Sequence, residues 1–175
     1  MPDTILFREK TMTDKSCWTN RVKLRRFTEQ DLTFMEQLYA VGRVAELAMT
    51  PFSDEQKFLF IKQQFTAQLT HYTTHYNSEK FEIIEVDGQM AGRLFIDIWD
   101  NEIRIVDIAL APHIQNQGLG GYLLNKVIEQ GRTLKKPVTI HVEQNNPAKR
   151  LYERLGFKEK SRTNEVYILM ERTCC

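Results

Sequence analysis

The stretch "APHIQNQGLGGYLL", residues 111–124, places a proline, two glutamines and three glycines between two apolar segments. The segment before it, "EIRIVDIAL", is typical of a strand, and the apolar positions after it repeat at helical spacing to about residue 134. "PVTIHVE" then returns as a second strand. Such a βαβ unit brings its two strands together in parallel, with a right-handed crossover. We therefore expect a parallel strand pair.

The residues before this unit predict antiparallel pairing. "FEIIEV" and "QMAGRLFIDIW" flank Asp87–Gly88, a turn pair that favours a two-residue hairpin. Upstream, "RVKLRRF" alternates like a strand, a helix is expected from Thr28 to about Arg43, and Ser53 with Gln56 forms a capping box before a long amphipathic helix. "EVYILME" is expected as the last strand. We predict an α/β (α+β) fold whose mixed, mostly antiparallel sheet contains a central parallel βαβ unit and is flanked by helices.

Composition limits the class of protein. With 175 residues, 42% hydrophobic and 27% charged, the chain fits one globular domain, which we place at residues 21–172 after an extension at 1–20 with a short strand at "TILF". The net charge of +1 gives no bulk attraction to nucleic acid or an anionic membrane. Three cysteines without metal-ligand spacing, and no apolar run of ~18 residues, lead us to expect a cytoplasmic protein.

The glycines of the loop suit a bound phosphate. Gly118, Gly120 and Gly121 remove side chains where a strand turns into a helix, so backbone N–H groups and the helix dipole can face an anion. Two familiar phosphate loops are excluded, because no G-K-S/T follows and the last glycine of a G-x-G-x-x-G run is replaced by Leu123. With Gln115, the loop instead fits Q-x-x-G-x-G. A tight turn that binds nothing is the alternative.

This pattern resembles the acyl-CoA pyrophosphate loop of the GNAT superfamily of N-acyltransferases. "NNPAKRLYERLGF", residues 145–157, resembles the second signature of that family, an Asn, an Ala and an L-Y-x-x-x-G-F ending after the next strand. The two motifs occur in the family's order and spacing. The resemblance implies the GNAT fold and transfer of an acetyl (acyl) group from acetyl-CoA to a primary amine by direct attack on the thioester, with acetyl-CoA as cosubstrate and no metal.

The resemblance also implies where acetyl-CoA would bind. The loop backbone would hold the pyrophosphate, and the strand edge before the loop, exposed by splaying of the strands, would pair with pantetheine like an added strand. The N-x-x-A spacing selects one asparagine and an N-P-A form the next, which could instead cap a helix beginning at Pro147. The candidate cofactor-binding residues are Ala109, Leu110, Gln115, Asn116, Gln117, Gly118, Leu119, Gly120, Gly121, Asn145, Asn146 and Tyr152.

Tyr152 is the candidate general acid. A phenol with a pKa near ~10 is protonated at neutral pH and is roughly matched to a thiolate leaving group, whose ordinary pKa is ~8.5. The family often places a tyrosine here in that role. The alternative is that the ring of Tyr152 only packs against the core or the cofactor.

A base is also expected, because an alkyl ammonium must lose a proton before it attacks. Alternation in "VTIHVE" puts His141 and Glu143 on one face near the end of the strand, and the family often carries a glutamate base near the position of His141. Asp107 is a third catalytic candidate, which alternation places on the same face as Ile103, although it could instead pair with an arginine such as Arg93 or Arg104. We rank Glu143 and His141 above Asp107.

The first half of the chain would supply the acceptor side. The resemblance assigns the pocket wall to the first two helices and the connection "AELAMTPFSDE", residues 45–55, and Trp99 with Asp100 could also line it. No signature there specifies the acceptor, which is expected to be a small-molecule or peptide amine. The histidines at 71 and 75 are expected to face solvent rather than bind metal, and the tyrosines at 72 and 76 to lie in the core.

Two other functions fit the same residues. One is a non-catalytic CoA-binding sensor or interaction module on the same fold, and the other is a structural protein whose loop holds no nucleotide. A tyrosine acid beside candidate bases favours the enzyme, since a pure binding protein needs neither. No nucleic-acid or membrane partner is expected, and a homodimer is compatible with the sequence.

Overall fold

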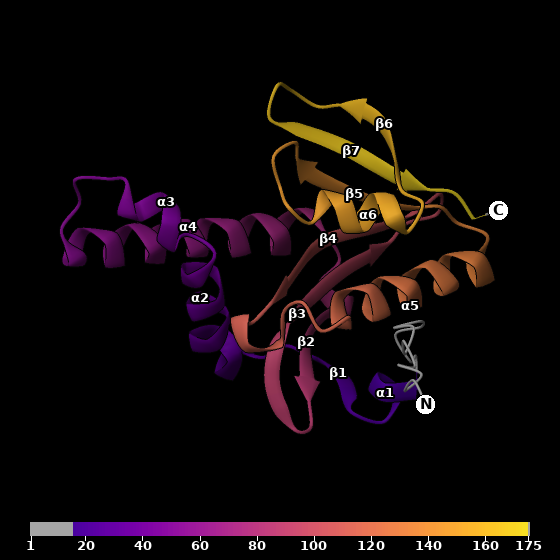
Figure 1. Ribbon diagram of the computed structural model, residues 1–175, viewed down its shortest axis with the longest axis horizontal. Coiled ribbons are helices and arrows are strands. Elements are labelled where there is room, and N and C mark those ends of the chain that lie inside the picture. The colour runs from indigo at the N-terminus through magenta and orange to yellow at the C-terminus, as the bar shows by residue number, and fades with distance from the viewer. Residues whose placement is uncertain (1–15, 175) are drawn as a thin grey trace, which may run out of the picture.

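A computed structural model describes residues 16–174 of the chain (Figure 1). Within them one sheet runs in the order β1-β2-β3-β4-β5-β7-β6, and neighbouring strands are antiparallel except β4 and β5. The predicted mixed sheet with a central parallel pair is thus confirmed. The strands are β1 (Val22–Arg26), β2 (Phe81–Val86), β3 (Gln89–Ile98), β4 (Ile103–Leu110), β5 (Val138–Glu143), β6 (Lys158–Arg162) and β7 (Tyr167–Arg172).

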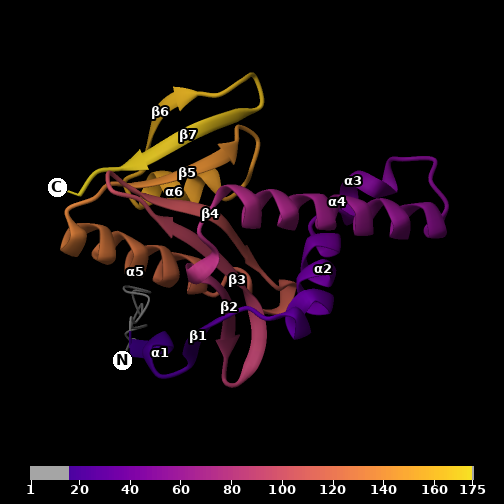
Figure 2. The same ribbon diagram turned by 180° about the vertical axis from the view of Figure 1, so that it is seen from behind.

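The helices lie on both faces of this sheet. Figure 1 shows α5 and α6 in front of it, and Figure 2 shows α4 crossing the opposite face, with α3 and the first half of α4 projecting as an arm. No helix within residues 16–174 is long and apolar enough to cross a bilayer. The helices are α1 (Ser16–Thr19), α2 (Leu32–Val41), α3 (Val44–Ala48), α4 (Asp54–His75), α5 (Leu119–Leu134) and α6 (Lys149–Arg154).

Each face of the sheet has its own apolar core. On the α5 face, Ile103 and Ile105 pack with Leu119 and Leu123 of α5, whose apolar side chains recur at helical spacing. On the α4 face, a smaller cluster is built from Met35, Phe65, Phe81, Ile83 and Phe95. Two independent cores hold the two groups of helices in place, so a site at the sheet has a rigid wall on either side.

β4 and β5 stay paired over only three residue pairs, which end at Ile105 opposite Ile140. Beyond that point β4 follows β3 to Leu110, while β5 follows β7 to Glu143. The pairing of β3 with β4 shifts register just beyond this point, because Val106 is an extra residue in β4, and this bulge adds twist where the strands separate. We call the region between residues 106–110 and 141–143 the strand opening. The splaying expected from the family resemblance is present.

Three local predictions need correction. Residues 16–19 were assigned to the extension but form α1, and Trp18 packs into the α5-side core; the "TILF" segment lies outside the described residues. The helix predicted to about Arg43 already ends at Val41, and the short helix α3 follows. β6 was missed because "KEKSR" is exposed along its whole length and shows no alternation.

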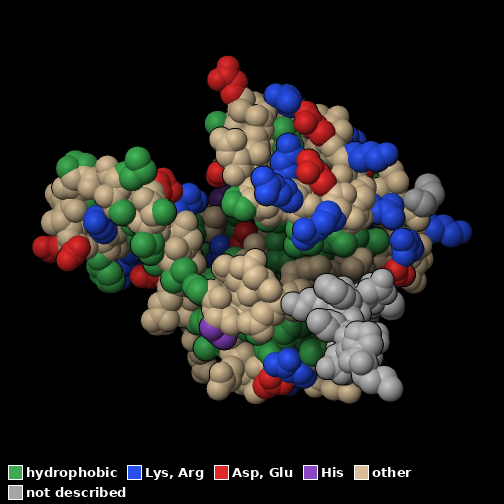
Figure 3. All heavy atoms as spheres, in the orientation of Figure 1, with side chains coloured by type: hydrophobic (Ala, Val, Ile, Leu, Met, Phe, Trp, Pro, Cys, Tyr) green, Lys and Arg blue, Asp and Glu red, His purple; other side chains and the backbone are tan. Residues whose placement is uncertain are grey.

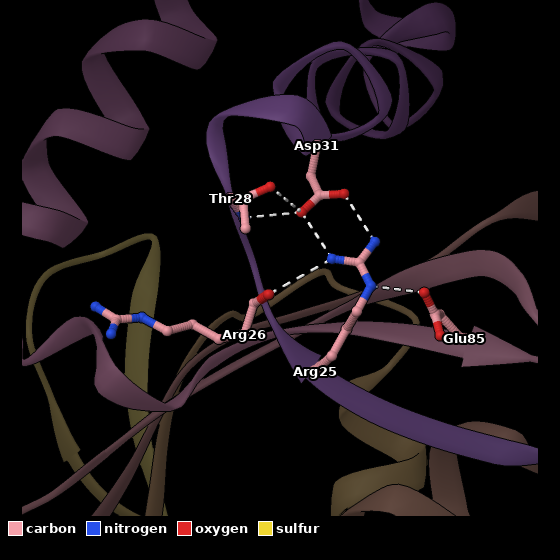
Figure 4. Close-up of polar contacts among 5 residues, drawn as sticks. All are labelled: Arg25, Arg26, Thr28, Asp31 and Glu85. Atoms are coloured by element: carbon pink, nitrogen blue, oxygen red, sulfur yellow. Dashed lines mark hydrogen bonds and ion pairs between the residues drawn. The ribbon is translucent and has the colours of Figure 1, made fainter.

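A charged network fixes α2 against the sheet (Figure 4). Arg25 on β1 donates from Nη2 to Oδ1 of Asp31 at 2.8 Å and from Nε to Oε1 of Glu85 at 2.6 Å. Asp31 is buried and also accepts the backbone N–H of Thr28 at 2.8 Å, which begins the short helical turn before α2. The Arg25 guanidinium holds the pKa of Asp31 below its ordinary value. The strand and the helix are therefore joined by charge-assisted hydrogen bonds.

We expect Asp31→Asn to lower the free energy of unfolding by about 2 kcal/mol at pH 7, because Arg25 loses a charged partner. The pKa of Asp31 is lower in the folded protein than in the unfolded chain. The contribution of the ionised Asp31 to stability is therefore fully present above the unfolded pKa and is lost as pH falls through the folded pKa. Urea unfolding of both proteins at pH 7 and pH 3 measures this. An equal difference at both pH values would contradict the prediction.

Candidate active site

The glycine loop connects the end of β4 to the start of α5. After a 3₁₀ turn at Pro112–Ile114, Asn116 has a φ of 58° and Gly118 a φ of 88°, and the helix begins at Leu119. Gly118 is the N-cap and offers no side chain to the first helical N–H groups, which have no partner within a helix. These N–H groups and the helix dipole together make a site suited to an anion.

The fold itself does not explain why residues 120 and 121 are glycines. A Cβ at Gly120 would lie 3.4 Å from Leu151 Cδ2, and one at Gly121 3.9 Å from Leu151 Cδ1, which are ordinary packing distances. Neither residue has a positive φ. Their small size therefore leaves the backbone accessible from outside, as close approach of a ligand to the loop requires. A tight turn alone would not need glycine at these two positions.

Side chains of the loop brace it rather than point to a ligand. Gln115 donates from Nε2 to the carbonyl of Leu110 at 2.9 Å, and Gln117 donates to the carbonyl of His113 at 2.8 Å. The Gln115 side chain therefore binds the last carbonyl of β4, at the end of the strand edge that we expected to pair with pantetheine. The neighbouring Ala109 stays on the side of β4 that faces away from α5, opposite Arg93 of β3.

Tyr152 reaches the sheet from α6. Its side chain is 4% exposed, and its ring meets the edge of Phe157 at a centroid distance of 5.9 Å. Burial raises the pKa of the Tyr152 hydroxyl to about 12, and the negative charge of Asp107 adds to that shift. The phenol therefore keeps its proton throughout the physiological range, and it lies within electrostatic range of a carboxylate on β4.

Asp107 lies on the opposite face from the one that alternation predicted. The bulge places an extra residue, Val106, in β4, so Ile103 and Ile105 pack toward α5 while Val106 packs toward α4. Asp107 pairs across the sheet with Phe95, a member of the α4-side core. The expected shared face with Ile103 is wrong, because a bulge shifts the phase of alternation by one residue.

Asp107 forms a charge contact with Arg93, as one of the predicted alternatives states. Arg93 Nε lies 2.5 Å from Asp107 Oδ2, and the side chains are 3% and 21% exposed. The angle of this contact is not that of a hydrogen bond, so Oδ2 has no hydrogen-bond donor among the described residues. Arg93 Nη2 donates to Gln68 of α4 at 2.8 Å. Asp107 is therefore held from behind by a buried cation while part of the carboxylate remains accessible.

Tyr72 of α4 approaches the same carboxylate. Its pKa is raised by burial first and by the charge of Asp107 second. The sequence placed Tyr72 in the core, and it does pack on the α4-side cluster, with its ring edge-on to Phe95 at 6.4 Å. Asp107 thus lies near two phenols, Tyr152 from the α6 side and Tyr72 from the α4 side. Sequence reasoning missed this second role of Tyr72.

Glu143 and His141 share one face of β5, as predicted. Glu143 Oε1 accepts a hydrogen bond from the Tyr167 hydroxyl at 3.0 Å, so one carboxylate oxygen is engaged at the rim of the opening. Burial and a nearby Arg104 lower the pKa of His141. Arg104 Nη1 lies 3.3 Å from His141 Nδ1, and because a guanidinium only donates, this nitrogen must carry the imidazole lone pair. The remaining nitrogen then carries the proton and cannot accept another.

The two asparagines lie in the turn between β5 and α6. The side chain of Asn146 accepts the backbone N–H of Ala148 at 2.9 Å, and its carbonyl accepts that of Lys149 at 3.0 Å. The helix begins at Lys149, two residues later than a Pro147 start would give, so Asn146 closes a turn before it. Asn145 beside it is exposed.

The segments expected to line the acceptor pocket lie in different parts of the fold. Residues 45–55 lie on α3 and the outer end of the arm, away from β4 and β5 (Figure 1). Trp99 packs on Tyr76 at a centroid distance of 6.1 Å and donates to Asp97, so it is a packing residue. The predicted exposure of His71 and His75 is confirmed.

A mixed sheet with a glycine loop at the point where its parallel strands part is the fold of a class of acyltransferases. The family model described as "Acetyltransferase (GNAT) family" matches residues 42–157, so the chain belongs to the GNAT acetyltransferase family.

Solved structures support this fold. The PaiA N-acetyltransferase of Thermoplasma acidophilum, solved with coenzyme A, superposes with a TM-score of 0.62 at 18% identity over 87% of this chain and 98% of that one. The ribosomal-protein-S18-alanine N-acetyltransferase of Escherichia coli gives 0.56 at 21% identity over 87% and 94%. An acetyltransferase of Thermus thermophilus gives 0.62 at 14% identity over 87% and 97%.

The contact between Arg93 and Asp107 predicts unequal effects of two isosteric substitutions. Asp107→Asn should lower the free energy of unfolding by about 2–3 kcal/mol, because a buried guanidinium loses its counter-charge. Glu143→Gln keeps an oxygen for the Tyr167 hydroxyl and should change stability by less than about 0.5 kcal/mol. Denaturant unfolding of the three proteins checks this, and equal losses would show that Asp107 is not the partner of a buried charge.

Proposed function

We propose that this protein transfers an acetyl group from acetyl-CoA to a primary amine. The observation that carries the proposal is the strand opening: β4 and β5 lose their pairing at Ile105 and Ile140, directly before a loop of accessible backbone N–H groups. An extended pantetheine arm can add to a free strand edge, and phosphates can bind at the start of α5. Acetyl-CoA would supply the acetyl group as a thioester.

Basic side chains lie where the nucleotide end of coenzyme A would project. Figure 3 shows lysine and arginine side chains over α6 and β6 with a few acidic ones among them, although the net charge of the chain is only +1. Lys149, Lys160 and Arg162 pair with glutamates there, whereas Arg150, Arg154 and Lys158 form no ion pair with a described residue. Lys149 and Arg150 begin α6, whose Leu151 is the residue nearest to the glycines of the loop. Local positive charge beside the loop favours a polyanion. The proposal therefore has an electrostatic basis that the overall charge does not reveal.

Residues from both faces of the sheet would handle the protons. Tyr152, protonated and on the α6 side, would donate its proton to the departing thiolate. Asp107 is our preferred acceptor of the amine proton. Its charge acts on Tyr152, so the carboxylate lies near the residue that would protonate the thiolate, and the amine must reach the carbonyl carbon next to that sulfur. Glu143 at the rim would be second. His141 drops below both, since its lone pair faces Arg104.

The cofactor site is tested by two substitutions at Gly120. Wild type at about a hundredfold excess of acetyl-CoA over its Kd should gain ~2.7 kcal/mol of stability, which raises Tm by about 5–10 °C in thermal unfolding. Gly120→Glu should lose this shift, because it places a carboxylate where phosphates bind.

Gly120→Ala is the sharper control. Without ligand it should be as stable as wild type or up to about 1 kcal/mol more stable, because its Cβ meets only ordinary contacts and alanine favours the helix. Its affinity for acetyl-CoA should nevertheless fall at least about tenfold. An unchanged affinity, or no shift in wild type, would mean that the loop is only a turn.

Tyr152→Phe tests the acid. We expect kcat, followed by thiol release against a panel of primary amines, to fall by about 10²-fold or more, while the thermal shift with acetyl-CoA stays. Because the pKa of Tyr152 is about 12, wild-type activity should rise with pH as the amine deprotonates and should not decline before pH ~10. Binding without turnover by wild type on every amine would instead indicate a sensor.

A further inference from the structure

The arm, together with the adjoining helix α2, carries most of the large hydrophobic side chains that are exposed. Among the ten large hydrophobic side chains exposed in residues 16–174, six lie between Val41 and Leu59, and Met49 at the end of α3 is 90% exposed. Figure 3 shows these side chains standing out on the arm beside the body of the molecule. Concentration of apolar surface on one projecting element marks an interaction site.

A groove of about 400 Å³ runs between α2 and the two helices of the arm. Leu47 and Ile61, each 7% exposed, form its floor, while Val44 and Phe58 stand on its edges with exposures of 62% and 59%. Met49 projects next to it. The same surface therefore presents both a hollow and side chains of a size to fill a hollow.

The groove also has charges of opposite sign on its two lips. Glu36 lines the groove from α2 and Lys57 from α4, and we call these two sides its lips. Neither forms a salt bridge with another described residue, whereas the neighbouring Arg43 and Glu46 pair with each other. A two-fold axis through the groove would place Glu36 of one copy opposite Lys57 of the other, twice in each interface.

We propose that this groove is the dimerisation surface of the protein, and that its occupant is the arm of a second copy. An isologous contact needs a surface complementary to itself in shape and charge, which a groove with projecting apolar side chains and lips of opposite sign provides. An anionic membrane or nucleic acid would require a basic surface, which these lips are not. The proposal does not depend on catalysis or on acetyl-CoA.

Charge reversal on the lips gives a test specific to a two-fold partner. Wild type should sediment as two 20.6 kDa chains in analytical ultracentrifugation at micromolar concentration. Glu36→Lys and Lys57→Glu should each weaken the dimer at least about tenfold, because each places like charges opposite one another at both lips. An equimolar mixture of the two variants should restore a heterodimer, since every lip contact then joins opposite charges.

Two further variants separate the interface from effects on folding. Phe58→Glu should also give a monomer with unchanged circular dichroism, whereas Leu134→Glu, which alters an exposed leucine at the end of α5, should remain a dimer. A wild type that stays monomeric at high micromolar concentration would overturn the proposal, as would a mixture of the two charge variants that does not associate. In that case the groove serves another polypeptide or none.

Discussion

The pairing of β4 with β5 ends after Ile105 and Ile140, and the rest of the site depends on that ending. Each strand is held beyond this point by a different neighbour, β4 by β3 and β5 by β7, so the two halves of the sheet diverge without leaving either strand unsupported. The bulge at Val106 adds local twist to β4 at the same level. A backbone edge that would otherwise be used within the sheet becomes available to a ligand.

Because the strands diverge, side chains from both faces of the sheet can approach the strand opening. Tyr152 belongs to the α5 and α6 side, whereas Asp107 is held by Arg93, which in turn donates to Gln68 of α4. The carboxylate and the Tyr152 phenol nevertheless lie within each other's electrostatic range. In the proposed mechanism the acid and the base would come from opposite sides of the sheet and would not compete for one position. Tyr152 is fixed by its packing in the α5-side core and Asp107 by its contact with Arg93, so both side chains are held in place before any ligand binds.

The sequence predicted the parts of this structure that follow from local patterns. The hairpin at Asp87–Gly88, the capping box of α4 and the βαβ unit around the glycine loop were all correct, because turn chemistry and periodicity determine them. Alternation failed at Asp107, since a bulge is set by pairing with another strand and leaves no mark in the residues themselves. The lone pair of His141 and the proximity of Tyr72 to Asp107 likewise depend on contacts between distant segments. The signal for a buried ion pair was the presence of charged residues, Arg93 and Asp107, inside two apolar strands.

The central claim is that the free edge of β4 receives the cosubstrate, and backbone amide hydrogen exchange resolved by NMR tests it most directly. With saturating acetyl-CoA, exchange should slow by about tenfold or more at those amides of residues 106–110 that do not pair with β3, and in the first turn of α5. Amides of β6, which lies at the far edge of the sheet, should be unaffected. Protection of the α5 turn alone, or of neither segment, would contradict the account of the strand opening.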